Sequence, residues 1–267
     1  MSATPTVGSF DGLSDVTLVV RQTRYEQLSF WLNPIGAIFT VGFSLVFLVL
    51  LGASAGNSRI SYYGDIKLIQ YYVPGFVAYG VMAACFNILA ITMVNRREMG
   101  LLKRLRLCPL PTWVLLTAVV LSSMIIAGVQ VVVLLVVGRV GFGVHPPSNV
   151  GAFILAVVVG MLSFSALGLA MSTLVPNQDA AGPIVSIVFF VLLFLSGLWF
   201  PLRPGSGLAQ FSAYFPVHHF IAAVFAPFDL QKGASPWAWH DLLVVAVWGL
   251  AGAIVAVRRW SWTPKRT

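Results

Sequence analysis

The residues best suited to chemistry in this 267-residue chain lie in the seventeen-residue stretch Asn95–Pro111, NRREMGLLKRLRLCPLP, between two long apolar runs. On a helix, its five cationic side chains share one face: Arg96, Arg97, Lys103, Arg104 and Arg106. The other face carries Glu98, Leu101, Leu102 and Leu105. The pattern predicts a short amphipathic helix over Asn95–Leu107 that lies parallel to a membrane and ends before Pro109 and Pro111.

Two roles for this basic stretch stay open on physical grounds. It could hold the loop on one side of a membrane and bind anionic lipid. It could also be a docking surface for a cytosolic partner. Glu98 favours docking, because lipid disfavours a carboxylate on an apolar face whereas a protein partner can pair with it.

A second group of residues could suggest a metal site or an acid–base site: His218, His219, Asp229, His240 and Asp241. Histidines near a membrane interface are usually structural, so we expect neither a catalytic residue nor a bound metal. Cys85 and Cys108 indicate neither a disulfide framework nor a zinc site. The chain has no GxxxxGK[ST] phosphate loop, so ATP would have to be hydrolysed on another subunit.

The composition tells which kind of protein must position these residues. Hydrophobic residues make up 58% of the chain and charged residues 9%, whereas a soluble domain carries about 25% charged residues. The net charge of +8 does not indicate nucleic-acid binding, because the cations lie at the ends of apolar runs. The composition is typical of a polytopic membrane protein.

Six apolar stretches are long enough, or nearly so, to cross about 30 Å of hydrocarbon. They are Phe30–Leu51, Tyr71–Val94, Trp113–Val137, Val150–Thr173, Pro183–Phe200 and Leu242–Val257. None contains Asp, Glu, Lys, Arg or His. The predicted fold is an all-α polytopic membrane protein, with one transmembrane domain over residues 1–267.

The cationic residues predict the orientation of these spans. Six spans place both termini on one side, together with Asn95–Pro111, and that side carries eleven of the sixteen Lys and Arg residues. Because cytoplasmic loops are enriched in Lys and Arg, we expect both termini in the cytoplasm.

Two flanking segments are predicted to be helical without spanning. Asp15–Leu32 mixes charged and apolar residues, which favours a helix lying on the inner leaflet. Pro201–Trp239 is too apolar for a solvated loop, and Leu208, Phe211 and Phe215 fall on one helical face. We therefore expect short re-entrant helices before the last span.

Several uncharged residues within the spans could line a substrate path or pack helices together. The candidates for a path are Asn87, Gln130, Phe189, Phe190, Phe194 and Ser196. Helix packing is the commoner role of such polar residues, and a Phe-rich span commonly faces lipid. The small residues Gly168 and Ser172 indicate close packing between helices.

The basic stretch, with its Arg-Glu, Gly and Leu-x-x-Leu run before a proline turn, resembles the cytoplasmic loop of ABC-2 type transporter permeases. Three further segments resemble the first span, the fourth and fifth spans, and the outer segment of that family: LNPIGAIFTVGFSLVFLVLLG, SFSALGLAMSTLVPNQDAAGPIVSIVFFVLLFLSGLWFPL and FSAYFPVHHFIAAVFAPF. The resemblance covers nearly the whole chain, in order, and is close to the daunorubicin-resistance-like exporters.

The resemblance implies a non-catalytic membrane subunit of an ABC exporter in a bacterial inner membrane. It implies a dimer of six-span permeases driven by a separate cytosolic ATPase, which binds ATP and Mg while this chain binds no cofactor. Residues 15–32 would be the elbow helix and residues 95–107 the coupling helix. The ATPase-coupling residues would be Arg97, Glu98, Gly100, Leu101, Leu102, Arg104 and Leu105.

The spans favour a hydrophobic or amphipathic cargo such as a drug or lipid, because they contain no charged side chain. Export of a polysaccharide or glycolipid is the alternative, since related permeases move such molecules. An ion-coupled secondary transporter is a third option, but such transporters usually need carboxylates or unwound helices within the membrane.

Overall fold

The computed structural model describes residues 15–55, 58–60, 66–100, 112–198, 207–228 and 235–260. Its long helices are α1 (Asp15–Trp31), α2 (Pro34–Ala55), α3 (Leu68–Met82), α4 (Leu89–Glu98), α6 (Thr112–Phe142), α7 (Val150–Leu174), α8 (Gln178–Leu195) and α11 (Trp239–Arg259). Its shorter elements are the strands β1 (Arg59–Ile60) and β2 (Ile66–Lys67), the π-helical turn η2 (Ala83–Ile88), α9 (Gly207–Ser212), α10 (Pro216–Phe225) and the 3-10 turn η3 (Ala226–Phe228).

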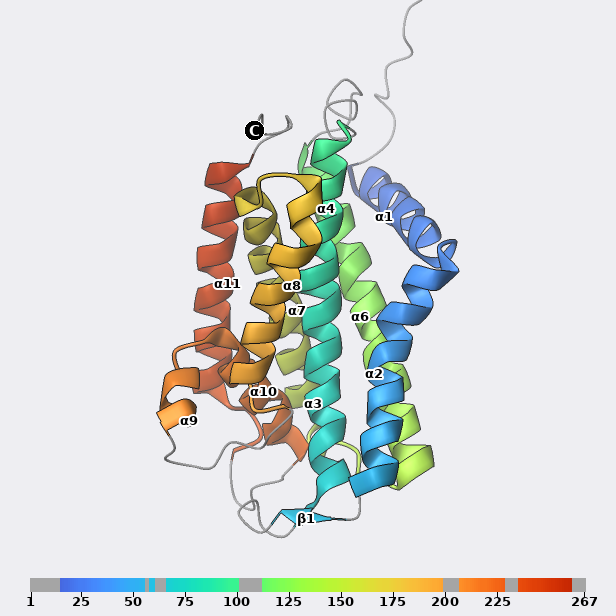
Figure 1. Cartoon of the computed structure of the whole chain (residues 1–267), viewed down its shortest axis with the longest axis vertical. Coiled ribbons are helices and arrows are strands. Elements are labelled where there is room, and N and C mark those ends of the chain that lie inside the picture. Colours follow the sequence, from blue (N-terminus) through green and yellow to red (C-terminus); the bar gives the residue numbers. More distant parts are fainter. Residues whose placement is uncertain are drawn as a thin grey trace, which may run out of the picture.

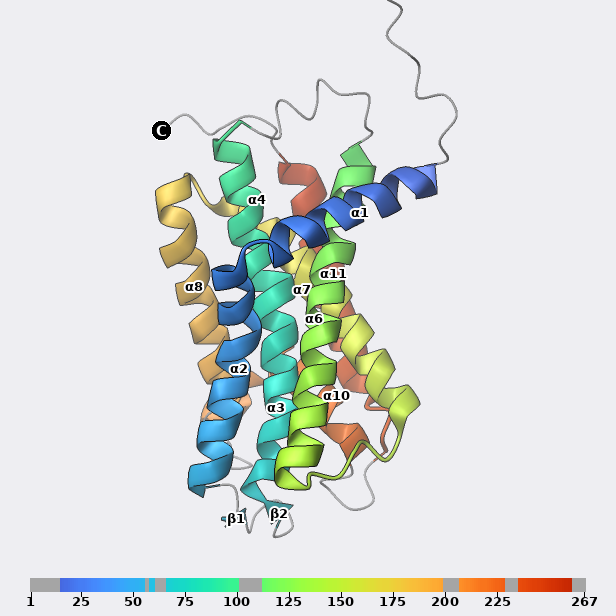
Figure 2. The same ribbon diagram turned by 90° about the vertical axis from the view of Figure 1, so that its right-hand side faces the viewer.

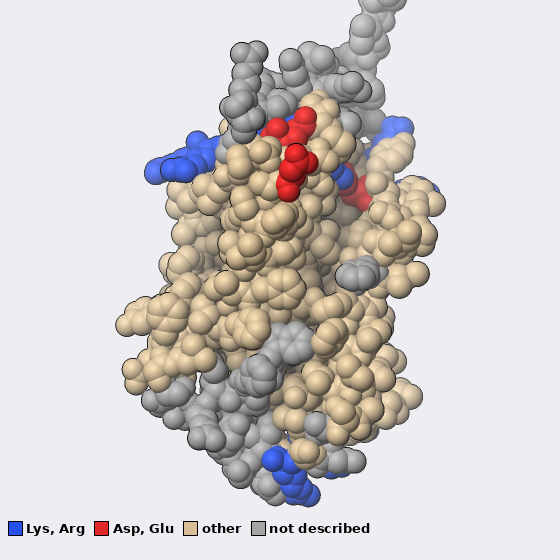
Figure 3. Space-filling model, in the orientation of Figure 1, with Lys and Arg blue, Asp and Glu red and all other residues tan. Residues whose placement is uncertain are grey.

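Six helices in this part of the chain are long and apolar enough to cross a membrane. They run roughly parallel in one bundle, while α1 lies obliquely across one end of it (Figures 1 and 2). On the face drawn in Figure 3, charged residues gather near the two ends and leave an uncharged band between them. The all-α polytopic fold predicted from the sequence is confirmed. We call the two ends the α1 end and the α10 end.

The second span is longer than the sequence pattern suggested. It covers Leu68–Glu98 in 31 residues, because α3, η2 and α4 join into one helix. The π-helical turn inserts an extra residue into the hydrogen-bonding pattern, and such turns often mark functional sites. The sequence pattern placed the end of this span at Val94, because the residues that follow are polar or charged. The helix nevertheless continues beyond Val94.

This continuous helix corrects the expectation of a separate amphipathic helix that begins at Asn95. Residues 95–98 are the last turn of α4, in line with span two. Gly100 has φ of +69°, a left-handed conformation that ends a helix at little cost when the residue is glycine. The remainder of the predicted coupling helix, residues 101–107, lies outside the described residues.

The predicted boundary between the elbow helix and span one falls close to the observed one. The Asn33 side-chain oxygen accepts a hydrogen bond from the Gly36 amide at 3.2 Å, and Pro34 is the first residue of α2. This is a helix N-cap followed by proline, a combination that starts a new helix in a new direction. Span one therefore begins at Pro34 rather than at Phe30.

The core lies around span two, whose side chains are buried from Tyr71 through Phe86. Span four crosses it closely at Gly168. A Cβ atom at this position would lie 2.8 Å from the Cys85 carbonyl oxygen and 2.9 Å from the Phe86 carbonyl oxygen. The small-residue pattern around Gly168 therefore reflects close helix packing, and the neighbour it packs against is the π-helical turn.

The α10 end holds the antiparallel pair β1–β2 and the two short helices that follow span five. α9 ends at Ser212, and Phe215 is the residue that precedes α10. Phe215 therefore does not continue one helical face with Leu208 and Phe211, as the spacing had suggested. The two helices are separate because Pro216 starts α10.

Candidate functional site

The last turn of α4 is the place where charged side chains of α1 and α4 meet. Arg96 binds Glu26 of α1 through two contacts, Nη1 to Oε1 at 2.8 Å and Nη2 to Oε2 at 2.5 Å. Both side chains are largely buried, with 16% and 10% of their surface exposed. A bidentate pair between guanidinium and carboxylate is among the stronger polar contacts in proteins. It ties the oblique helix α1 to the end of span two.

Arg97 points to a different side of the same turn and is almost fully buried. Its Nη1 donates to the Ser172 carbonyl at 3.0 Å and its Nη2 to the Val175 carbonyl at 2.7 Å. These carbonyls lie at the end of α7, where carbonyl groups lack partners within the helix and where the helix dipole favours a cation. Arg97 therefore caps span four.

Glu98 balances the charge of this buried cation. Its Oε1 accepts a hydrogen bond from Arg97 Nε at 2.7 Å, and the Glu98 side chain is 12% exposed. The guanidinium of Arg97 is thus held by backbone carbonyls and by one carboxylate together. We call Glu26, Arg96, Arg97 and Glu98 the arginine node.

The node differs from the arrangement expected on sequence grounds. We expected Arg96 and Arg97 on an exposed basic face and Glu98 on a docking face. Instead, Arg96 and Arg97 bind distant parts of the same chain, and Glu98 pairs with its neighbour Arg97. The partner Glu26 lies 70 positions away in the sequence and the carbonyl groups about 75, and no local pattern links residues at such separations. The coupling candidates Leu101, Leu102, Arg104 and Leu105 lie outside the described residues.

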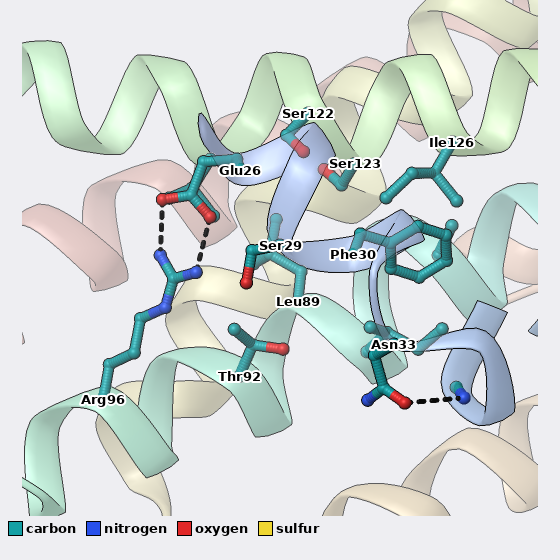
Figure 4. A pocket seen from close by; sticks show the side chains of 14 residues that line it. Glu26, Ser29, Phe30, Asn33, Leu89, Thr92, Arg96, Ser122, Ser123 and Ile126 are labelled. Atoms are coloured by element: carbon teal, nitrogen blue, oxygen red, sulfur yellow. Dashed lines mark hydrogen bonds and ion pairs between the residues drawn. The ribbon is translucent and has the colours of Figure 1, made fainter. Parts of the chain in front are cut away.

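A pocket of about 160 Å³ opens beside the node, between α1, span two and α6 (Figure 4). It is lined by Glu26, Ser29, Phe30, Asn33, Gly36, Ala84, Ile88, Leu89, Thr92, Arg96, Val119, Ser122, Ser123 and Ile126. Gln27 strengthens this corner, because its Nε2 donates to the Ser122 carbonyl and hydroxyl, each at 2.8 Å. Helix α1 is thereby fixed to span three as well as to span two.

The chemistry of this pocket is that of a small amphipathic binding site. Hydroxyl and amide groups lie beside apolar side chains such as Phe30, Leu89 and Ile126. Its two ionisable lining residues, Glu26 and Arg96, neutralise each other. The lining therefore offers no free general acid or base, and the pocket is suited to binding rather than to proton transfer.

The six candidates for a substrate path differ in their burial and in their contacts. Gln130 is fully buried, and its Nε2 donates to the Ser44 hydroxyl of α2 at 2.7 Å. Ser196 donates to the Leu193 carbonyl at the end of α8. These two contacts are those of residues that pack or cap helices.

The other four candidates divide between the interior and the surface of the chain. Phe189 is buried and lies 5.7 Å from Tyr79 between ring centres. Phe190 and Phe194 are exposed on the outer side of α8. Asn87, in the π-helical turn, has a buried side-chain oxygen without a hydrogen-bond partner among the described residues. Which side chains of a helix are buried depends on the rotation of the helix about its own axis. The apolar sequence of span five does not define that rotation.

Comparison with known proteins relates this chain to one family and to transport permeases. Residues 54–258 match the family described as ABC-2 family transporter protein. A stretch of 178 residues is 27% identical to the "Putative transport permease YvfS" of Bacillus subtilis (strain 168), covering 66% of this chain and 70% of that protein. A stretch of 173 residues is 24% identical to the "Probable multidrug ABC transporter permease YbhR" of Escherichia coli (strain K12), covering 64% of this chain but 47% of that protein.

Proposed function

Because the chain belongs to the ABC-2 family of transporters, we propose that it is the permease of an ATP-driven exporter that moves a hydrophobic or amphipathic drug or lipid out of the cell. It is a multi-pass membrane transport permease. Permeases of this family generally pair with an ATPase subunit. The arginine node is the main structural support for this proposal, because it joins the end of span two to α1 and to the end of α7.

The node gives the basic stretch a mechanical role. Residues 101–111 follow directly after Gly100, and in this proposal they dock on the ATPase. A displacement of this segment would move the last turn of α4, to which Arg96 and Arg97 belong. Arg96 would pass the movement to α1 through Glu26, and Arg97 would pass it to the junction between α7 and α8. The pocket beside α1 would change shape as the elbow helix moved.

Orientation and assembly follow from the distribution of charge and of apolar surface. The α1 end faces the cytoplasm in this proposal, because most of the Lys and Arg residues belong to that side. Span five exposes Phe190 and Phe194 on one side. We place the second permease against that side, since large apolar patches commonly mark interfaces between proteins as well as contacts with lipid.

The choice of cargo rests on the composition of the spans. Asp, Glu, Lys, Arg and His residues fall only near their ends, so the apolar interior is suited to a molecule that needs no charged partner. One relative carries the word multidrug in its name, which supports a drug over a polysaccharide.

Copurification tests the proposal. Two copies of the chain with different affinity tags are expressed together with the cell's own ATPases, and one tag is used for purification. We expect an ABC ATPase and the second tagged copy in the same complex. In vesicles, this complex should move a hydrophobic dye with ATP, and a hydrolysis-deficient ATPase should stop it. Purification of the chain alone, with dye movement driven by a proton or sodium gradient, would contradict the proposal.

A further inference from the structure

At the α10 end, three side chains from two helices bring their ligand atoms together. His219 lies in α10, while His240 and Asp241 lie in the first turn of α11. Their nitrogen and oxygen atoms all lie within 4.8 Å of one another. We propose that these residues form a binding site for a divalent transition-metal cation of the zinc class. The site is independent of the proposed transport function.

The hydrogen bonds of His219 set the state of its imidazole ring. Nε2 lies 2.9 Å from the Ala213 carbonyl, and because a carbonyl can only accept, Nε2 must carry the proton. Nδ1 lies 2.6 Å from Asp241 Oδ1. A neutral ring would turn a lone pair toward the carboxylate there. Either a proton lies between the two atoms at this distance, or a metal cation binds both groups and holds these atoms farther apart.

His240 distinguishes these two possibilities. Its Nδ1 lies 3.8 Å from the same oxygen of Asp241. An imidazolium at His219 needs one counter-ion, which Asp241 supplies, and gives no role to a second imidazole. A divalent cation uses both nitrogens and the carboxylate. His219, fixed by the Ala213 carbonyl, has the arrangement that metal-binding histidines usually show, with the second ring nitrogen donating to a backbone carbonyl.

The ligand set selects the class of cation. Two imidazoles and one carboxylate suit zinc and related transition metals, whereas calcium and magnesium prefer oxygen ligands. Zinc lies about 2.0–2.1 Å from each ligand, so ligand atoms in a tetrahedral site are about 3.3 Å apart. Binding of zinc would separate His219 Nδ1 and Asp241 Oδ1 from 2.6 Å to about this distance, and the His240 side chain, which is 82% exposed, can turn inward. Water would complete the coordination.

The surroundings show what such a cation would do. The positive end of the α11 dipole opposes a cation there, and the charge of Asp241 offsets this effect. Ala238, just before α11, has φ of 36°, a strained left-handed conformation for a residue other than glycine. The cation would fasten α10 to the start of the last span, on either side of the segment 229–234.

The test measures zinc binding to the full-length protein, purified without a histidine tag and stripped with a chelator. Equilibrium dialysis against zinc should show one high-affinity ion per chain. His240→Ala and Asp241→Asn should each weaken binding at least about tenfold, while His145→Ala, which removes an exposed histidine outside the cluster, should bind as the wild type does. His240 is exposed, so its variant should fold normally.

Thermal unfolding gives a second readout. Zinc should raise the Tm of the wild type and of His145→Ala but not that of His240→Ala, because a ligand stabilises only the folded state that binds it. If the wild type binds zinc no better than His240→Ala and Asp241→Asn do, His219 and Asp241 form an ion pair only. If His145→Ala loses binding to the same degree, the zinc is bound adventitiously at the surface. Either result overturns the proposal.

Discussion

At the α1 end, Arg97 carries a permanent charge and directs its donors at two carbonyl groups of α7 and at Glu98. At the α10 end, His219 also contacts a carboxylate and a carbonyl, those of Asp241 and Ala213, but there it is a ligand of the proposed zinc site. Both contacts fasten helices that are distant in the sequence. The two ends therefore differ in kind, because the contacts at the α1 end are complete within the chain, whereas the contact at the α10 end is one to which the proposed cation would bind.

The largest effect is expected at Arg97. Arg97→Ala leaves two carbonyls and the Glu98 carboxylate without their partner, and removing one member of a buried ion pair costs about 3–5 kcal/mol. Arg97→Lys should recover part of this, because an ammonium group cannot match the fork of a guanidinium. Unfolding in mixed micelles measures both. Arg258→Ala, an exposed cation at the end of α11, is the control and should change the free energy of unfolding by less than about 0.5 kcal/mol.

The second prediction concerns α7, the helix that joins the two ends. It meets Arg97 at one end, and Phe164 lies 5.1 Å from Phe220 of α10 between ring centres. Gly168→Ala should destabilise the fold by about 1–3 kcal/mol, since the new methyl group would meet backbone oxygens that cannot move aside. Gly128→Ala, which meets no atom within 4 Å, should be neutral or slightly stabilising. Equal effects of the two substitutions would contradict close packing at Gly168.

A smaller effect is expected from the pair that holds the elbow helix. A double-mutant cycle with Glu26→Ala and Arg96→Ala should give a coupling energy of about 1–2 kcal/mol, because the contact is bidentate but partly exposed. The unfolding free energies of the four proteins give this value directly. Additive effects of the two substitutions would mean that α1 is held by Gln27 and by apolar packing instead.

The smallest predicted effect distinguishes the two ends by their response to pH. Burial lowers the pKa of His218 below 6.5, with a further decrease from His219 and an opposing effect of Asp241. The unfolded chain therefore binds a proton at higher pH than the folded chain. The stability of the folded chain is unaffected by His218 above the pKa that this residue has in the unfolded chain. It falls as pH drops from there toward the pKa of His218 in the folded chain. Thermal unfolding measured between pH 7.5 and 5 gives the decrease of Tm with pH. This decrease should be smaller in His218→Gln than in the wild type and unchanged in Arg258→Ala.

The sequence was sufficient to predict six spans, a helix over most of residues 15–32 and the family. These depend on the length of the apolar runs and on the mixture of charged and apolar residues before the first of them, which are local properties of the chain. The arginine node was not predictable in the same way. Arg97 was a coupling candidate and Arg96 was expected on an exposed basic face, but their partners, Glu26 and the Ser172 carbonyl, come from distant helices. The α10 end shows the same limit, because His219 and Asp241 were noted while their contact depends on how α10 packs against α11.

The central claim is that residues 95–111 transmit the work of an ATPase to the bundle, and paired variants within the basic stretch test it. The complex with its ATPase is reconstituted in vesicles, and dye export and ATP hydrolysis are measured together for Leu102→Ala and Lys103→Ala. If an apolar face docks on the ATPase, Leu102→Ala should hydrolyse ATP with little export, because truncation of a packed leucine costs about 2–5 kcal/mol. Lys103→Ala should export almost normally, since an exposed charge contributes about 0–1 kcal/mol. Normal export by both variants, or a loss with Lys103→Ala alone, would contradict the account.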